Sequence, residues 1–305
     1  MSDTETLNVF EFFKRFPNEE AARLHFEEMR WHGHATCPHC GTGDVVECKD
    51  HKPMAYRCRK CRKHFSVRTG TVLAESKVPL RKWLMAIYLL TTSRKGISSI
   101  QLAKTLGVTQ KTAWFLAHRI REAWTGRQGF LGPDVEMDET YLGGKERNKH
   151  NSKKLRAGRG AVGKEAVIGL RERAGRVQGH HVARTDRKTI RALVAANVAD
   201  GATLYTDEFG AYRGIGSRHH TVNHSIGEYV RGSIHTNSIE SFWALLKRGH
   251  YGIYHHMSPK HLQRYVDEFA TRCNLSGTSF DGIMSHTVMA MVGRRLTYGA
   301  LIHGA

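Results

Sequence analysis

The spacing of apolar residues predicts several amphipathic helices in the first 124 positions. Residues 18–30 carry apolar side chains at helical intervals behind Asn18, a typical helix-capping residue. Residues 78–93 repeat the pattern, with Pro79 near the first helical position, where proline is favoured. The residues expected to be buried are Ala22, Leu24 and Phe26 in the first helix, and Leu80, Trp83, Leu84, Ile87 and Leu90 in the second.

Residues 97–124 predict two shorter helices joined by a tight turn. Ser98 can cap the first and Thr109 the second, and Gly107 suits the turn between them. The apolar residues placed to pack the two helices together are Ala103, Leu106, Val108, Ala113, Leu116 and Ile120. This pattern is typical of a helix-turn-helix, although an ordinary helical hairpin shares it. The residues expected to be exposed for DNA contact on the second helix are Gln110, Lys111, Thr112 and Arg119.

A Gly-rich stretch at residues 125–133 marks a change from helical to strand-like spacing. The strands expected beyond it are residues 135–144, 165–173, 176–184 and 202–210, and the expected helices are residues 186–198 and 233–249. In the last helix, one apolar stripe consists of Ile239, Phe242, Trp243 and Leu246. The order strand-strand-strand-helix-strand-helix predicts a mixed α/β domain.

The charge balance indicates the class of binding partner. The 305 residues include 47 Lys and Arg against 28 Asp and Glu, and the formal charge of +19 favours a polyanion such as DNA, RNA or an anionic membrane. No apolar run has transmembrane length, and the acid-containing start lacks the pattern of a signal peptide. We therefore expect a cytoplasmic protein that binds nucleic acid, with no membrane partner.

Four of the six cysteines are spaced for a metal. Cys37 and Cys40 form one CxxC pair and Cys58 and Cys61 another, with 17 residues and two short strand-like runs between them. Where thiols stay reduced, this spacing is typical of a zinc ribbon, in which four thiolates bind one tetrahedral Zn²⁺. Redox use is the alternative for a single CxxC, but two in tandem favour structural zinc.

A glycine-flanked basic loop spans residues 143–165, between the first two strands of the mixed domain. Its composition predicts a mobile segment that clamps a phosphate backbone, although single residues of such a loop are often only solvated. The lysines expected to contact DNA here are Lys145, Lys149, Lys153 and Lys154.

Three carboxylates occupy positions where strands and a helix can converge. Asp138 lies in the first strand of the mixed domain, Asp207 at the end of the fourth, and Glu240 in the helix that follows. Clustered carboxylates repel one another unless a cation binds, and Mg²⁺ prefers such oxygen ligands together with substrate phosphates. Two such ions can promote an in-line phosphoryl displacement. A basic protein with this site is expected to cut phosphodiesters.

These assignments have rivals. Glu240 lies three residues after Asn237, so it can instead complete a capping box at the start of its helix. By strand alternation, Glu136 shares a face with the first-strand acid and is a competing ligand, whereas Glu139 and Glu208 are expected to point away from their neighbours.

The segments "MDETYLGGKERNKH", "LYTDEFGAY" and "HTNSIESFWALLKRGHYGIYHHMS" resemble the three catalytic blocks of DDE transposases from bacterial insertion sequences. With the preceding zinc ribbon and helix-turn-helix, residues 31–274 are similar to the zinc-ribbon-bearing ISXO-type group. The resemblance implies a ribonuclease-H-like catalytic fold in which Asp138, Asp207 and Glu240 are the metal-binding acids. Lys247 matches the basic residue that commonly follows the third acid, and is implied to contact DNA near the cut.

The resemblance implies a DNA transposase that binds the terminal inverted repeats of its element, cleaves at the element ends and joins the 3′-OH strand to target DNA with Mg²⁺ or Mn²⁺. It also implies homo-oligomers on double-stranded DNA and association with a bacterial nucleoid. Two alternatives stay open: an inactive DNA-binding regulator, and a plain ribonuclease-H-like nuclease that cuts without joining. The expected α+β multidomain order is a helical lead at 1–30, a zinc ribbon at 31–75, a helix-turn-helix region at 76–124, the catalytic domain at 130–290 and a tail at 291–305.

Overall fold

The computed structural model describes residues 7–48, 50–126, 129–144, 146–155, 161–173, 175–216, 218–221 and 237–304. They form two compact units, each with its own buried core. Unit 1 comprises the described residues of Met1–Trp124 and Gly277–Ala305, and unit 2 those of Thr125–Ser276. No described helix combines the length and apolar character that a membrane span needs.

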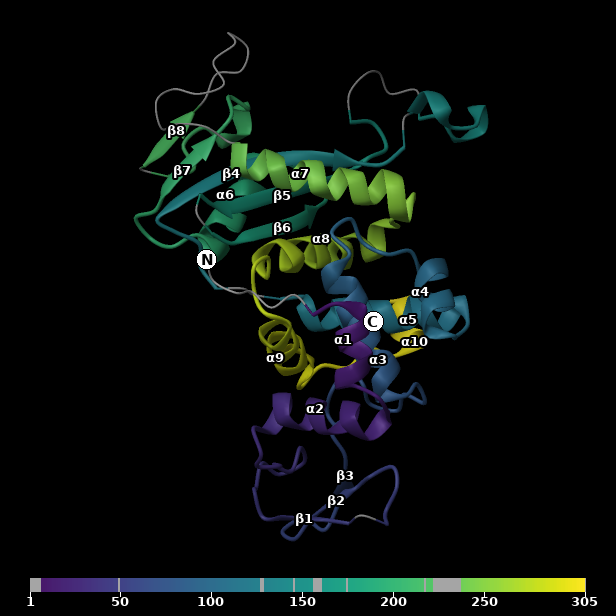
Figure 1. The fold of residues 1–305 in the computed structure, drawn as a ribbon. Coiled ribbons are helices and arrows are strands. Elements are labelled where there is room, and N and C mark those ends of the chain that lie inside the picture. Colours follow the sequence, from purple (N-terminus) through teal and green to yellow (C-terminus); the bar gives the residue numbers. More distant parts are fainter. Residues whose placement is uncertain are drawn as a thin grey trace. The chain divides into compact units, whose positions relative to one another are not determined.

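Unit 1 is mainly helical, with one small antiparallel sheet (Figure 1). Its helices are α1 (Val9–Arg15), α2 (Glu19–Trp31), α3 (Leu80–Thr92), α4 (Ser99–Leu106), α5 (Gln110–Trp124), α9 (Phe280–Met291) and α10 (Tyr298–His303). Its strands pair in the order β1 (Val45–Glu47), β2 (Tyr56–Cys58) and β3 (His64–Phe65).

The expected caps start the helices of unit 1. The Asn18 side chain accepts a hydrogen bond from Ala21 N at 2.9 Å, and Ser98 does the same for the first turn of α4. Gly107 adopts a left-handed conformation (φ +59°) at the end of α4, as the predicted turn requires. Every residue expected to be buried in α3 is buried, but Leu24 of α2 is 52% exposed, so that prediction is wrong. Leu24 lies two residues from the buried Ala22, which puts it on the opposite side of the helix.

The last two helices of the chain belong to unit 1, although residues up to 290 were expected in the catalytic domain. Phe280, Met284, Val288 and Met291 repeat at helical spacing and enter the same core as the aromatic residues of α1 and α3. Beyond α9, the chain forms an isolated antiparallel bridge between Val292 and Thr71. Apolar spacing identifies the buried face of a helix, but it does not say which core that face joins.

Unit 2 is a five-stranded mixed sheet with helices on both faces. Its strands are β4 (Asp134–Leu142), β5 (Glu165–Glu172), β6 (Val177–Val182), β7 (Thr203–Thr206) and β8 (His219–Thr221), in the order β6-β5-β4-β7-β8. The first three strands are antiparallel, and β7 and β8 add in parallel. The helices are α6 (Arg187–Asn197), α7 (Asn237–Gly249) and α8 (Pro259–Asn274), with a π-helical turn at His250–Tyr254 and short 3₁₀ turns at Glu146–Asn148, Asn151–Lys153 and Gly210–Tyr212.

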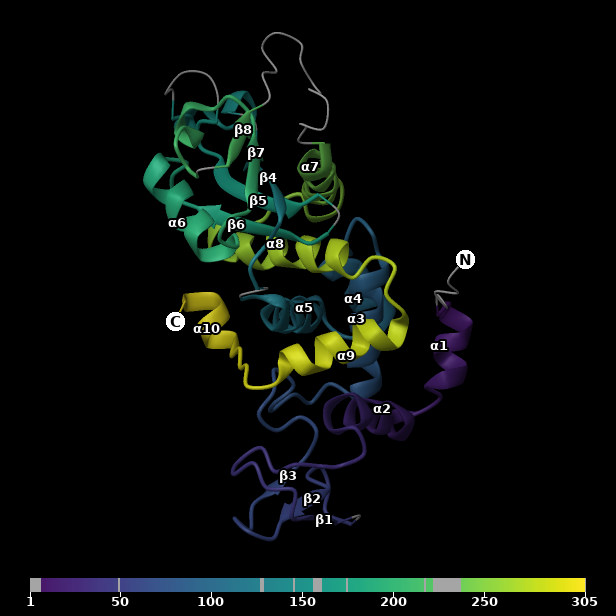
Figure 2. The same cartoon turned by 90° about the vertical axis from the view of Figure 1, so that its left-hand side faces the viewer.

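The two faces of this sheet have separate cores. Helix α6 covers one face through Ile190, and α7 and α8 cover the other (Figure 2). The four residues predicted to form the apolar stripe of α7 are all buried there. The predicted strands and α6 are confirmed in order, whereas β8 and α8 were not expected. The described part of α7 begins at Asn237, and residues 233–236 of the predicted helix lie outside the described residues.

Candidate metal centres and nucleic-acid interface

The four paired cysteines of unit 1 converge on one point. Their sulfur atoms all lie within 4.8 Å of one another, with Cys37 Sγ 3.7 Å from Cys61 Sγ and Cys40 Sγ 3.6 Å from Cys58 Sγ. Tetrahedral Zn²⁺ with bonds of about 2.3 Å separates its sulfur ligands by roughly 3.8 Å, so this spacing fits zinc. The backbone N–H of Cys61 donates to Cys58 Sγ and lowers the pKa of that thiol to about 7, which favours the thiolate that a metal requires.

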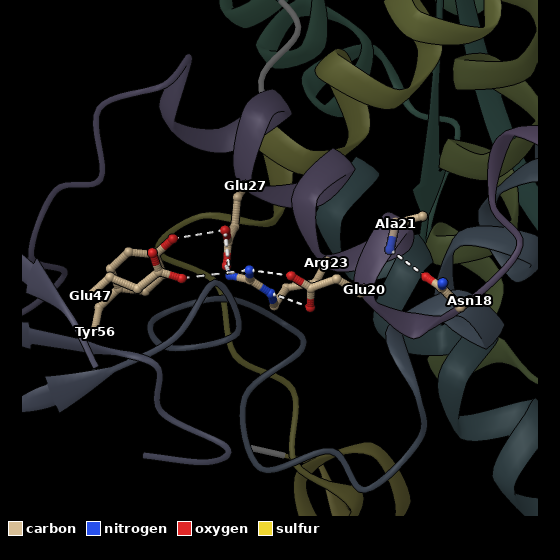
Figure 3. Close-up of polar contacts among 7 residues, drawn as sticks. All are labelled: Asn18, Glu20, Ala21, Arg23, Glu27, Glu47 and Tyr56. Carbon is tan, nitrogen blue, oxygen red and sulfur yellow. Dashed lines mark hydrogen bonds and ion pairs between the residues drawn. The ribbon is translucent and has the colours of Figure 1, made fainter. Parts of the chain in front are cut away.

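A polar network joins the cysteine segment to α2 (Figure 3). Arg23 of α2 donates to Glu20 and to both carboxylate oxygens of Glu27, and its guanidinium lies 3.7 Å from Glu47 of β1. Tyr56 of β2 donates to Glu27 Oε2 at 2.8 Å. Strands β1 and β2 are therefore both tied to one face of α2, which orients the cysteine segment within unit 1.

The predicted DNA-reading residues of α5 divide into two groups. Gln110 and Lys111 are exposed and Thr112 is half-buried in the first turn, and Lys111 Nζ lies 4.6 Å from the ring of Tyr298 on α10. Arg119 was expected to be exposed but is only 7% exposed, so that prediction is wrong. The helix continues inward after its first two turns, and Arg119 donates to the carbonyl of Ala74 and stacks on the rings of Trp83 and Phe115.

The predicted basic loop is described in part. Lys149 forms an ion pair of 2.6 Å with Glu146, and Lys154 is half-buried. Lys145 lies outside the described residues, as does the side chain of Lys153. The contacts of these lysines with DNA stay a prediction.

Asp138 and Asp207 are brought together by strand register. Strands β4 and β7 run parallel, with Glu136 opposite Tyr205, so Asp138 is level with Asp207 just beyond the end of β7. Asp138, Asp207 and Glu139 each place a carboxylate oxygen within 4.8 Å of the other two. These three residues are called the acid group below.

The presence of Glu139 in this group contradicts the expectation that it points away from Asp138. The two residues do start on opposite faces of β4, because Trp243 of α7 donates to Asp138 while Tyr212, from the other face, donates to Glu139. Strand β7 ends at Thr206, so the edge of β4 next to Asp207 is open and both side chains can reach around it. Alternation predicts the face from which a side chain starts, but not how far it turns at an open edge.

The acid group is electrostatically unfavourable without a cation. Burial raises the pKa of Asp138 to about 7, and the neighbouring charges of Glu139 and Asp207 add to this rise. Burial likewise raises the pKa of Glu139, although the hydrogen bond from Tyr212 opposes it. A divalent cation among these oxygens would relieve both the burial penalty and the repulsion.

Helix α7 approaches the acid group by its buried side. Ile239 N donates to Glu136 Oε2 at 3.0 Å, and Trp243 Nε1 donates to Asp138 Oδ2 at 2.9 Å. Glu136 is thus a fully buried partner of the helix N-terminus and, among the described residues, stands outside the acid group. Glu240 lies between these two contacts in sequence, with an exposed side chain outside the group as well. Lys247, in the last turn, is exposed.

Sequence reasoning missed two contributors to this site. Trp243 was assigned only to the apolar stripe, although a buried indole N–H normally needs an acceptor, and that requirement was the available signal. Tyr212 comes from the 3₁₀ turn after Asp207, a segment without apolar periodicity, and nothing in its spacing pointed to the site.

Comparisons with known proteins agree with these two centres. Residues 130–274 match the ISXO2-like transposase domain, and residues 17–64 match a transposase zinc-ribbon domain. A protein of Halobacterium salinarum, described as an uncharacterized protein in transposable element ISH50, is 32% identical over 252 residues, which cover 77% of this chain and 84% of that protein. No solved structure matches the chain significantly.

Proposed function

The chain belongs to the family of insertion-sequence transposases with a zinc ribbon and an ISXO2-like transposase domain, and from this premise we propose that it is an active DNA transposase. In this proposal, it binds the terminal inverted repeats of its element, cleaves a phosphodiester at each end and transfers the resulting 3′-OH strand to target DNA. The observation that carries the proposal is the convergence of Asp138, in the middle of β4, with Asp207, just beyond the carboxyl end of the adjacent parallel strand β7. The strand order β6-β5-β4-β7-β8, with α6 between β6 and β7, supports a ribonuclease-H-like fold for unit 2.

The acid group fits hard divalent cations. Its donors are carboxylate oxygens only, and their burial and mutual repulsion favour cation binding. When bound, two Mg²⁺ or Mn²⁺ ions supply an activated nucleophile and stabilise the leaving oxygen. In this proposal, Asp138 and Asp207 would hold the ions from the sheet, Glu240 would complete the site from α7, and Lys247 would bind a DNA phosphate nearby. Because water and then a DNA 3′-OH act as nucleophiles, no side chain forms a covalent bond with DNA.

DNA recognition is assigned to unit 1. We interpret α4 and α5 as a helix-turn-helix, with Gln110, Lys111 and Thr112 at the DNA-facing end of α5. The zinc ribbon of unit 1 and, in unit 2, the basic loop add phosphate contacts, as the formal charge of +19 favours. A homo-oligomer that pairs two element ends is part of the proposal, and the DNA substrate places the protein on the nucleoid of its host.

A strand-transfer assay tests the proposal. Labelled DNA carrying the end of the element is incubated with zinc-loaded protein, supercoiled plasmid and Mg²⁺. We expect end-specific joining in the wild type, and its loss in Asp138→Asn, Asp207→Asn and Glu240→Gln. Glu208→Gln is the matched control, because Glu208 neighbours Asp207 but stands outside the acid group in the described structure.

The outcomes separate the alternatives. End binding without cleavage would favour the inactive regulator, and cleavage without joining would favour the plain nuclease. Full activity of Glu240→Gln would remove Glu240 from the proposed ligand set and leave Glu139 as the third acid.

A further inference from the structure

Two side chains of β4 hold α7 against the sheet. Glu136 and Asp138 lie two residues apart and therefore share a face. The first accepts the backbone N–H of Ile239, which is one of the N–H groups that the start of a helix leaves without an intrahelical acceptor. The second accepts the indole N–H of Trp243, one helical turn later. Together they define both the position of α7 along β4 and its rotation.

The close approach of α7 depends on a glycine opposite Asp138. Gly169 of β5 pairs with Asp138 across the ladder. A Cβ at Gly169 would lie 2.6 Å from Trp243 Cζ2 and 2.7 Å from Ile239 Cδ1, far inside van der Waals contact. The sheet is therefore shaped to receive the Trp243 ring directly beside the acid group. An apolar helix face alone does not require a glycine at this position.

We propose that Trp243 is a positioning residue for the metal site: its indole N–H holds Asp138 Oδ2, leaves Oδ1 for a cation, and sets the turn of α7 that carries Glu240. This inference rests on the proposed function, because it assigns Asp138 to a cation. A short aspartate side chain rotates freely unless one oxygen is held, and hydrogen bonds from neighbouring groups typically orient metal-binding carboxylates. The buried ring of Trp243 is 4% exposed, so its N–H direction is fixed by packing.

The test measures Mn²⁺ binding by the zinc-loaded protein from the electron paramagnetic resonance signal of free Mn²⁺. Trp243→Phe removes the N–H but keeps an aromatic ring, and we expect its dissociation constant to rise about three- to tenfold, the effect of one lost orienting hydrogen bond. Trp124→Phe is the matched control, because the Trp124 indole is also buried and donates to Thr287 in unit 1. We expect it to leave Mn²⁺ binding unchanged.

A second readout reports proximity directly. Tb³⁺, a hard cation that also prefers oxygen ligands, emits when a nearby indole is excited at a wavelength that tyrosine does not absorb. We expect sensitised emission from the wild type and from Trp124→Phe, but not from Trp243→Phe. Gly169→Ala, which displaces the Trp243 ring without removing it, is expected to weaken Mn²⁺ binding as Trp243→Phe does.

Failure of the proposed metal site and failure of the proposed role of Trp243 give different results. If wild-type binding of Mn²⁺ does not depend on Asp138, as judged with Asp138→Asn, the proposed metal site is wrong. If binding depends on Asp138 but is equal in wild type and Trp243→Phe, Trp243 only fills space and the inference is overturned. A lower melting temperature of Trp243→Phe with unchanged Mn²⁺ affinity has the same meaning.

Discussion

Asp138→Asn is expected to stabilise the protein when no divalent cation is bound to the acid group, and increasingly so as the pH rises. An aspartate has an ordinary pKa of 3.8, and in the folded protein burial, with the charges of Glu139 and Asp207, raises the pKa of Asp138 to about 7. Between these values the folded state holds a proton that the unfolded state has lost, so the free energy of unfolding falls as the pH rises. At about 1.4 kcal/mol per pH unit, the penalty reaches roughly 4 kcal/mol above neutrality and is absent near pH 4.

The assay compares wild type and Asp138→Asn by differential scanning calorimetry at pH 5 and pH 8, in zinc-loaded protein with and without Mg²⁺. The unfolding transition of unit 2 is identified as the one whose melting temperature changes when Mg²⁺ is added to the wild type. Without Mg²⁺, we expect the variant to be more stable at pH 8 and to lose most of that advantage at pH 5. Saturating Mg²⁺ is expected to reverse the order, because it binds the wild-type carboxylate. An equal difference between the two proteins at both pH values would refute the reasoning.

Four further substitutions have defined outcomes. Cys58→Ser is expected to abolish zinc binding and the fold of the cysteine segment, as measured by metal content and circular dichroism; retention of one zinc per chain would contradict the four-thiolate site. Met284→Ala removes a fully buried side chain of α9 and should lower the free energy of unfolding of unit 1 by about 2–5 kcal/mol in urea, whereas no change would show that α9 does not pack there. Arg119→Ala is expected to lower stability by roughly 2 kcal/mol, because it removes a buried charged hydrogen bond and two ring contacts. Lys111→Ala should instead change the free energy of unfolding by no more than about 0.5 kcal/mol and weaken binding to element-end DNA. If Arg119→Ala weakened DNA binding without lowering stability, Arg119 would again be assigned to DNA contact.

Local patterns predicted the elements of this protein well, because caps and apolar periodicity act over a few residues. The caps at Asn18 and Ser98, the left-handed turn at Gly107 and the buried stripe of α7 are all found in the structure. The four thiolates were predictable for a related reason, since each CxxC fixes two ligands within one tight turn and two such pairs can close a tetrahedron.

The composition of the acid group was only partly predictable, because it depends on strand register and on where a strand ends. Asp138 and Asp207 become level only through the parallel pairing of β4 with β7, which residue spacing suggests but does not determine. Glu139 joins them because β7 stops at Thr206 and leaves the edge of β4 open. Arg119 was misassigned for a comparable reason: a charged residue on a helix looks exposed in the sequence, but here the loop residue Ala74 supplies a carbonyl, and Trp83 of α3 and Phe115 of α5 supply the rings that receive its guanidinium.

Helix α9 packs in the core of unit 1, and this affects how a copy of the gene can lose its activity. The ribosome makes residues 280–291 after every cysteine of the ribbon, both helices of the proposed DNA-reading pair and all three proposed catalytic acids. A nascent or truncated chain that stops before Phe280 therefore leaves part of the core of unit 1 uncovered, including the rings of Phe12 and Phe16. A frameshift in the last tenth of the reading frame is thus expected to silence the element while its diagnostic motifs all stay readable. An inventory of intact copies in a genome should accordingly require α9 (Phe280–Met291), and not the acids alone.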